Sequence, residues 1–351
     1  MPISRVRHRA QLTAQSLAVL LAAFAVGACG TDADNTAVDA SAASAAFPVT
    51  IEHKFGATRI AASPRRVVTV GYNDQDFVLA LGITPVGVRE WIGDKPRATW
   101  TWAQDELGDA KPAVLSSSEL NFEQIAALRP HLILSTYSGI TDKEYGRLSK
   151  IAPTVAQPGE FVDFGVPWQE QTRIIGRALG RQQRAEQVVE QLEARFAKTR
   201  AAHPEFRQAT AAFAYNFEGK SGSFGAYGTQ DPRVRFMTAL GFDTDERIDK
   251  LAADRFFTPI SGERLRLLDQ DVLIIIGPTP DRRRAIEQNK LYGRLSVVRK
   301  GAVIYLDMFD EISGAVSFNS PLSLPFAIDE LVPRLVAAVD ADPTTKVAEA
   351  K

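Results

Sequence analysis

The sequence predicts an α/β protein with two Rossmann-like lobes that are bridged by one long α-helix. Short apolar runs rich in Val and Ile alternate with helical patterns in both halves of the chain, which is typical of parallel sheets. Between the halves this alternation stops, and residues 181–202 form a single amphipathic helical pattern. The chain of 351 residues is too long for one ordinary core and suits two.

The first 28 residues have the features of a secretory signal peptide. A basic start with three arginines precedes an apolar stretch, and the small residues Gly27 and Ala28 mark a cleavage site. Cys29, the only cysteine, follows directly, as in the lipobox whose cysteine is acylated. We therefore expect lipid anchoring at Cys29 on the outer face of the cytoplasmic membrane. An ordinary signal peptide followed by an unrelated cysteine is the alternative.

The composition then divides the remaining chain. Residues 29–47 are small and polar, which predicts a flexible tether. The further expected segments are an N-terminal α/β lobe at 48–180, the bridging helix at 181–202, a C-terminal α/β lobe at 203–340 and a disordered tail at 341–351.

Charge and composition exclude several classes of protein. The formal net charge is −1, and removal of residues 1–28 leaves about −4, which argues against nucleic acid or an anionic membrane as the main partner. A single cysteine allows no internal disulfide. No later apolar run reaches the ~18 residues that a membrane-spanning helix requires.

The elements of the first half are expected in a strand–helix order. The patterns predict strands at 66–71, 83–88 and 131–136, and helices at 76–82 and 122–130. In the second half they predict strands at 211–215, 271–277 and 302–307, and helices at 233–241 and 262–269.

An internal repeat relates the two halves. FEQIAALRPHLIL, which starts at Phe122, and GERLRLLDQDVLI, which starts at Gly262, are offset by 140 residues. Both predict a helix with an acid in its first turn, Glu123 or Glu263, followed by a strand. The alternative is the general similarity of any two helix–turn–strand units.

The bridging helix is predicted from its apolar face. Residues at helical spacing form this face, and charged residues occupy the opposite one. The apolar residues are Ala185, Val188, Val189, Leu192 and Phe196. Gly180 and Pro204 bound the pattern, so the helix is ~30 Å long and forms a stiff connector.

Several segments occur in a specific order behind the lipobox. They are RVV-x-x-Gly-Tyr at 66–72, ITPVGV at 83–88, EQIAALRPHLIL at 123–134, LSKIAPTVA at 148–156, IIGRALGRQQRAEQVV at 174–189 and ISGERLRLLDQDVLIII at 260–276. In this order the chain resembles the ferric-siderophore-binding lipoproteins of ABC importers, and WIGDKPRATWTWA with DPRVRFMTALGF is similar to their actinobacterial siderophore branch. The resemblance covers 48–335. It implies the class III periplasmic-binding-protein fold, a ligand in the cleft between the lobes, and no enzymatic activity.

The same resemblance implies the partners. The ligand is an Fe(III)-siderophore with no covalent cofactor, and an ABC permease dimer with a cytoplasmic ATPase receives it. Glu123 and Glu263 are implied to meet arginines on the two permease subunits, although an acid in the first turn of a helix is also stabilised by the helix dipole alone. We expect the chain to be a monomer.

Ligand-binding residues are expected where strands end, because α/β lobes bind ligands at the carboxyl ends of their strands. The candidates are Tyr72, Arg89, Trp91, Tyr137, Tyr215, Phe224, Tyr227 and Arg233, each with core packing or surface exposure as its alternative. A siderophore satisfies its iron with its own oxygens, so the protein supplies aromatic walls and a few charges rather than metal ligands. Arg89 and Arg233 favour an anionic chelate. Catecholate, hydroxamate and mixed chelates all remain open.

Two rival functions follow from the same residues. Haem would need an axial ligand such as Tyr72, Tyr137, Tyr215 or Tyr227, and cobalamin is a further ligand of this family. A lipid-anchored envelope enzyme is disfavoured, because the sequence has no Gly-x-Ser-x-Gly motif and no P-loop lysine. The mature histidines, His53, His131 and His203, show no zinc spacing.

Overall fold

The computed structural model describes residues 46–216, 224–277 and 279–340, which all belong to one compact unit. The predictions for the signal peptide, for Cys29 and for nearly all of the tether lie outside these residues, as does the predicted tail at 341–351. Among the described residues, no helix combines the length and the apolar composition that crossing a membrane requires.

The first half is built on a five-stranded parallel sheet. Its strand order is β5-β4-β3-β6-β7, so the chain starts at the centre and winds outward on both sides, as in a Rossmann-type sheet. The strands are β3 (Val67–Thr69), β4 (Gly87–Arg89), β5 (Ala113–Leu115), β6 (Leu132–Ser135) and β7 (Thr154–Ala156). An antiparallel hairpin of β1 (Val49–His53) and β2 (Gly56–Ile60) precedes this sheet.

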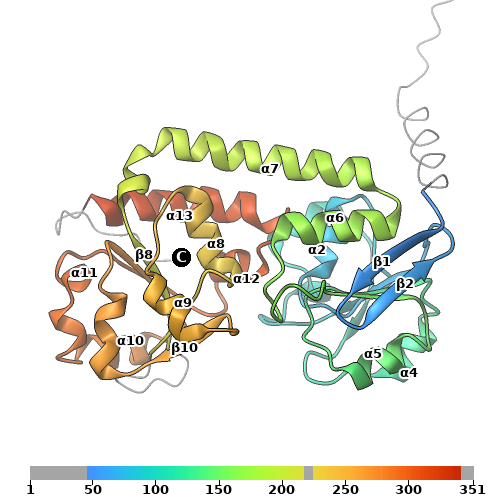
Figure 1. Ribbon diagram of the computed structural model, residues 1–351, viewed down its shortest axis with the longest axis horizontal. Helices are drawn as coiled ribbons and strands as arrows, with labels where there is room; N and C mark the ends of the chain where they lie inside the picture. Colours follow the sequence, from blue (N-terminus) through green and yellow to red (C-terminus); the bar gives the residue numbers. More distant parts are fainter. Residues whose placement is uncertain (1–45, 217–223, 278, 341–351) are drawn as a thin grey trace, which may run out of the picture. The chain divides into compact units, whose positions relative to one another are not determined.

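The helices of the first half surround this sheet (Figure 1). They are α2 (Asp74–Ala80), α3 (Gln104–Leu107), α4 (Phe122–Ala127), α5 (Asp142–Leu148) and α6 (Trp168–Leu179), with 3₁₀ turns η1 (Pro96–Ala98) and η2 (Thr101–Ala103). Two predicted boundaries differ. The strand expected at 83–88 begins at Gly87, because Pro85 has no N–H for a ladder. The helix expected at 122–130 ends at Ala127, since the residue before Pro130 avoids helical geometry.

The second half repeats the same strand order. Its sheet runs β10-β9-β8-β11-β12, with β8, β11 and β12 parallel and β9 antiparallel to both of its neighbours. The strands are β8 (Ala211–Tyr215), β9 (Phe224–Tyr227), β10 (Phe257–Ile260), β11 (Val272–Ile276) and β12 (Val303–Leu306). Phe224 and Tyr227, which we expected beyond the end of a strand, therefore lie within a strand. The position was mispredicted because FGAY contains a glycine, which is commoner in turns than in strands; in this strand Gly225 makes room for the Tyr215 ring.

The remaining elements of the second half are mainly helical. They are η3 (Pro204–Gln208), α8 (Pro232–Leu240), α9 (Glu246–Ala252), η4 (Gly262–Leu268), α10 (Pro280–Glu287), η5 (Tyr292–Arg294), α11 (Ser296–Arg299), α12 (Glu311–Phe318) and α13 (Ser323–Val339). The helix expected at 262–269 is η4, a 3₁₀ helix. Helix α4 and η4 each lead into the strand next to the first strand of their sheet, so the internal repeat has a structural counterpart.

One helix, α7 (Gln182–Ala202), connects the two halves. It packs against α6 of the first half and against α8 and α13 of the second half (Figure 1). Its buried residues are the five that the apolar pattern identified: Ala185, Val188, Val189, Leu192 and Phe196. Gly180 ends α6 with a left-handed φ of 66°, a conformation that glycine adopts without strain.

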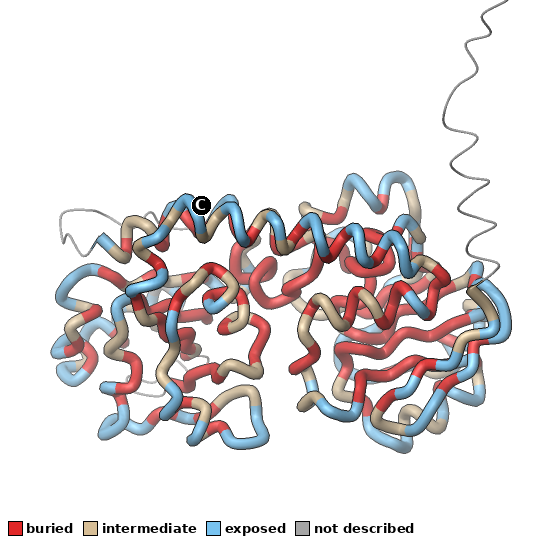
Figure 2. Tube along the Cα trace, turned by 45° about the horizontal axis from the view of Figure 1, so that its top comes forward, coloured by how far each residue is buried: buried red, intermediate tan, exposed pale blue. Residues whose placement is uncertain are grey.

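The core lies on both faces of the sheets. Val67 and Leu132 belong to the largest apolar cluster, whereas their strand neighbours Val68 and Ile133 belong to a second cluster on the opposite face. Every residue of β3 and β6 is buried, and Figure 2 shows buried strands in the interior of this half. Burial on both faces explains why the strands appear in the sequence as continuous apolar runs.

Candidate ligand-binding site

Three aromatic rings meet at the carboxyl ends of β3, β4 and β6. The Tyr72 ring stacks on the Trp91 ring with centroids 5.6 Å apart, and Trp91 meets the Tyr137 ring edge-on at 6.0 Å. The Tyr72 amide donates to the Tyr137 carbonyl at 2.9 Å, which fixes the two strand-end loops against each other. The structure thus brings together the three aromatic candidates of the first half.

Arg89 is the last residue of β4, and its guanidinium lies over the Tyr72 ring, 4.3 Å from the centroid. It donates to the carbonyls of Val70 and Ser117 at 3.3 and 3.1 Å. Burial lowers the pKa of Arg89, and the neighbouring Tyr72 raises it. An arginine pKa lies so far above neutrality that the side chain remains a cation there. Arg89 therefore gives the first half a fixed positive charge behind the aromatic rings.

The second half contributes its own aromatic group. Tyr215, at the end of β8, lies 5.2 Å from the Tyr227 ring and 5.8 Å from the Phe257 ring. The Tyr215 ring covers Gly225 of the neighbouring strand, where any Cβ would overlap it. Phe256 stacks on Tyr227 at 6.5 Å. These rings form one face of the second sheet.

Arg233 is held over this face by a buried ion pair. Its Nη1 donates to Oδ2 of Asp231 at 2.8 Å, and its Nε donates to Ser317 Oγ at 3.2 Å. The guanidinium stacks on the Tyr227 ring at 4.4 Å. The Asp231 side chain is 1% exposed and the Arg233 side chain 11%. Burial raises the pKa of Asp231, while the charge and hydrogen bonds of Arg233 lower it.

The two aromatic groups make contact with each other. Phe164, from the first half, lies 6.0 Å from Phe256, and Trp91 lies 5.2 Å from Phe318 at the end of α12. We call nine of these rings the aromatic cluster: Tyr72, Trp91, Tyr137, Phe164, Tyr215, Tyr227, Phe256, Phe257 and Phe318. Further rings contact its edge, Trp100 and Trp102 at Phe318 and Phe213 at Tyr227. Phe164, Phe256, Phe257 and Phe318 were missed by the sequence reasoning, because each lies in a segment without a strand-end signal.

Burial affects the phenols of the aromatic cluster. It raises the pKa of Tyr137 and of Tyr227 far above the ordinary value, although Arg233 lowers both. These two tyrosines therefore remain neutral. An axial ligand to haem iron would need the tyrosinate form, so their surroundings disfavour the haem alternative at these two positions.

One candidate lies outside the aromatic cluster. Phe224 is buried and stacks on Tyr292 with centroids 5.8 Å apart. Phe224 and Tyr227 are three residues apart on β9, so they point to opposite faces of the sheet. The structure therefore places Phe224 in the core behind the sheet, away from the other candidates.

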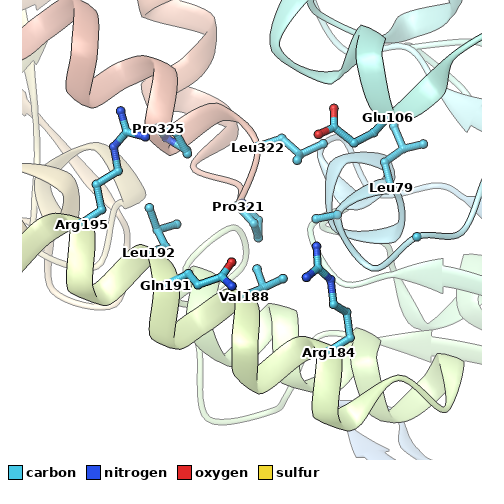
Figure 3. Close-up of a pocket in the computed structure, with 12 residues that line it drawn as sticks. Leu79, Glu106, Arg184, Val188, Gln191, Leu192, Arg195, Pro321, Leu322 and Pro325 are labelled. Carbon is cyan, nitrogen blue, oxygen red and sulfur yellow. The ribbon is translucent and has the colours of Figure 1, made fainter. Parts of the chain in front are cut away.

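A pocket of about 440 Å³ lies in a different place, along α7. Figure 3 shows Val188 and Leu192 of α7 facing Leu79 of α2 and Leu322 near the start of α13. None of its lining residues belongs to the aromatic cluster. Within the described ranges, no group of three or more His, Cys, Asp or Glu side chains is arranged to hold a metal ion.

Glu123 and Glu263 are both exposed, in the first turns of α4 and η4. Their surroundings differ. Glu263 lines a shallow surface pocket together with four cations, Arg247, Lys250, Arg264 and Arg266.

Comparison with known proteins defines the class. A family model described as periplasmic binding protein matches residues 67–308, more than half of the chain. The chain belongs to this family, whose members are substrate-binding transport proteins and not enzymes.

Individual relatives are similar over most of their length. The structure of a periplasmic solute binding protein from Mycobacterium smegmatis is 34% identical with a TM-score of 0.72, and the match covers 83% of this chain and 98% of that one. PiaA from Streptococcus pneumoniae, solved in complex with ferrichrome, is 27% identical with a TM-score of 0.74, covering 84% and 99%. YfiY of Bacillus subtilis, a probable siderophore-binding lipoprotein, is 25% identical, covering 80% and 86%.

These similarities confirm the predicted fold class, two α/β lobes bridged by a helix in the manner of class III periplasmic binding proteins. They also confirm the resemblance to siderophore-binding proteins of ABC importers. The individual candidate side chains stay predictions.

Proposed function

We propose that this protein is a lipid-anchored receptor that captures an Fe(III)-siderophore at the aromatic cluster and delivers it to an ABC permease. The observation that carries this proposal is a set of aromatic rings from both halves, with one arginine stacked on a tyrosine in each half. Flat rings suit the apolar faces of a large chelate, and arginines suit its anionic oxygens. The iron keeps its coordination by the siderophore.

The charges at the cluster favour a chelate with net negative charge. Arg89 and Arg233 stack on cluster tyrosines, and Arg235 donates to the Gly165 carbonyl beside Phe164. Asp231 offsets one of these three cations. The surplus is positive and partly buried, where an opposite charge on the ligand interacts more strongly than in water.

A fluorescence titration tests this function. The probes are ferrichrome, Fe(III)-citrate and an anionic ferric tris-catecholate, with haem and cobalamin as competing ligand classes. We expect quenching by at least one ferric siderophore, because Trp91 lies within the cluster. Absence of quenching by every ferric chelate, together with a shifted haem Soret band, would replace the proposal with haem binding.

A matched variant separates a specific charge from general electrostatics. Arg147 lies 3.6 Å over the Phe122 ring, an arginine–aromatic pair outside the cluster. Arg89→Gln should weaken binding of the ferric chelate that binds most tightly in this titration by about ten- to a hundredfold. This is the range expected for the loss of one charged hydrogen bond. Arg147→Gln should leave the affinity unchanged.

Docking to the permease is proposed through Glu123 and Glu263. Both are exposed, and each precedes the equivalent strand of its own sheet, which suits a pair of related permease subunits. Among the four cations that line its pocket, Arg247 pairs with Asp245 and Lys250 with Glu246, which leaves Arg264 and Arg266 to offset the charge of Glu263. We therefore expect Glu123 to contribute more to permease docking than Glu263.

Membrane attachment is proposed through Cys29, and the receptor is proposed to act as a monomer. Metabolic labelling with a palmitate analogue tests the first point, since Cys29→Ala should abolish the label. Light scattering of the released chain at micromolar concentration tests the second.

A further inference from the structure

Phe164 lies where the rings of the two halves meet. It follows β7 in the segment that leads to α6, and its ring is surrounded on three sides. The ring centroid is 6.2 Å from Tyr72, 5.3 Å from Tyr137 and 6.0 Å from Phe256. These are van der Waals contacts between rings, so the Phe164 side chain fills space between the wall of the first half and the wall of the second.

The backbone at Phe164 is in an unfavourable conformation. Its φ is +65°, in the left-handed region that residues with bulky side chains rarely adopt. The end of its ring rests on the backbone of Gly139, where a Cβ would lie 2.6 Å from Cζ of Phe164. The ring contacts therefore hold a backbone conformation that the residue would not choose alone.

The segment around Phe164 is fixed to both halves. On one side, Lys54 of the turn after β1 pairs with Asp163 at 2.6 Å. On the other side, Arg235 of α8 donates to the Gly165 carbonyl. Phe164 thus sits in a short span between a contact to the first half and a contact to the second. A change in the distance between the halves acts directly on this residue.

We propose that Phe164 is a displaceable placeholder whose ring occupies part of the ligand site and must leave it when a chelate binds between the two walls. This inference rests on the proposed function and concerns the same site. Displacement allows the backbone to leave the left-handed conformation, which partly offsets the ring contacts that are lost. A chelate must supply enough surface to replace three ring contacts, so Phe164 selects against small chelates such as Fe(III)-citrate.

Stopped-flow fluorescence on the full chain tests this placeholder. The probe is the ferric chelate that binds the wild-type protein most tightly in the titration above, and tryptophan emission, to which Trp91 of the cluster contributes, supplies the signal. Phe164→Ala should associate about tenfold faster than the wild type, and its affinity for Fe(III)-citrate should rise relative to that for the larger chelate. Phe161→Ala is the control, because Phe161 is in the same segment and has no ring partner among the described residues.

A different role for Phe164, as a permanent wall of the ligand site, predicts the opposite result. If Phe164 is a wall of the site, Phe164→Ala weakens binding about tenfold or more and leaves the association rate unchanged, which overturns the placeholder. Phe164→Leu replaces Phe164→Ala if the latter does not fold, because it retains apolar volume and loses the flat ring. A rate at or below that of the wild type in this variant also overturns the inference.

Hydrogen exchange of the wild-type protein gives an answer without any variant. Amides of residues 159–165 should exchange faster with the chelate bound, since the ring leaves its contacts. Unchanged or slower exchange there contradicts the placeholder while the proposed function stands. If the wild-type protein binds no ferric chelate at all, both the proposed siderophore-binding function and this inference are refuted.

Discussion

Replacing Arg233 with glutamine separates its role in binding from its role in stability. Asp231, its partner, is 1% exposed and accepts hydrogen bonds from both the backbone amide and the guanidinium of Arg233. Removing the guanidinium leaves a buried carboxylate without its hydrogen-bonded counter-charge, and Arg235 remains as a weaker one. Breaking such a pair costs about 3–5 kcal/mol in free energy of unfolding. We expect a loss of this size for Arg233→Gln at pH 8, measured by urea unfolding.

The loss should be smaller at low pH. Burial raises the pKa of Asp231, and in Arg233→Gln the counter-charge that lowers it is gone. The folded state of the variant then binds a proton that the unfolded state releases above pH ~4. A group with a folded pKa above its unfolded pKa stabilises the fold at low pH and loses that contribution as the pH rises. Arg233→Gln should therefore be more stable at pH 5 than at pH 8.

The double variant Asp231→Asn/Arg233→Gln completes the test. It removes the charge of Asp231 together with its partner, so most of the lost stability should return. Ligand affinity should stay low in the double variant, because the guanidinium that we propose to contact the chelate is still absent. A double variant that regains affinity along with stability would refute the assignment of Arg233 as a ligand-binding residue. If each single substitution lowered the free energy of unfolding equally, and the double variant lost the sum of the two, the ion-pair argument would be refuted.

Three further predictions concern other parts of the molecule. Burial raises the pKa of Asp76 to about 7, so Asp76 should lower wild-type stability by about 2–4 kcal/mol as the pH rises from 4 to 8. Other buried carboxyls, such as Asp74, contribute in the same direction, so Asp76→Asn should reduce the pH slope in urea unfolding by this amount. Glu123→Arg should reduce iron uptake by cells more than Glu263→Arg, with ligand affinity unchanged in both; an equal effect would contradict the offset by the cations around Glu263. Gly180→Ala should lower the free energy of unfolding by about 1 kcal/mol, because φ is 66° there, and an unchanged melting curve would count against strain at the end of α6.

Periodicity made the connector predictable. The five apolar residues of 181–202 repeat at helical spacing, and the same five are buried in α7. Strand-end position likewise identified Tyr72 and Tyr137, because a parallel sheet places every strand's carboxyl end at one edge. These features depend on local pattern and on a general rule of topology. Neither requires knowledge of which distant segments pack together.

The missed residues lack such a pattern. Phe164 lies in an irregular segment and Phe318 at the end of a helix, and both reach the cluster only through the packing of distant elements. The error at Phe224 has a local cause instead. Once 224–227 is recognised as a strand, its alternation separates Phe224 from Tyr227. A strand assignment for FGAY would therefore have corrected that prediction from the sequence alone.

The end of α12 links the proposed site to the contact between the halves. Ser317 accepts a hydrogen bond from Arg233 at 3.2 Å, and the Phe318 carbonyl accepts one from Asn73 of the first half at 2.7 Å. Ser320 then donates to Asp76 of the first half at 2.6 Å. Only three peptide bonds separate Ser317, which binds Arg233, from Ser320, which binds the buried carboxylate of Asp76. If Arg233 binds the ligand as proposed, any shift of its side chain would act on the same short segment that joins the two halves.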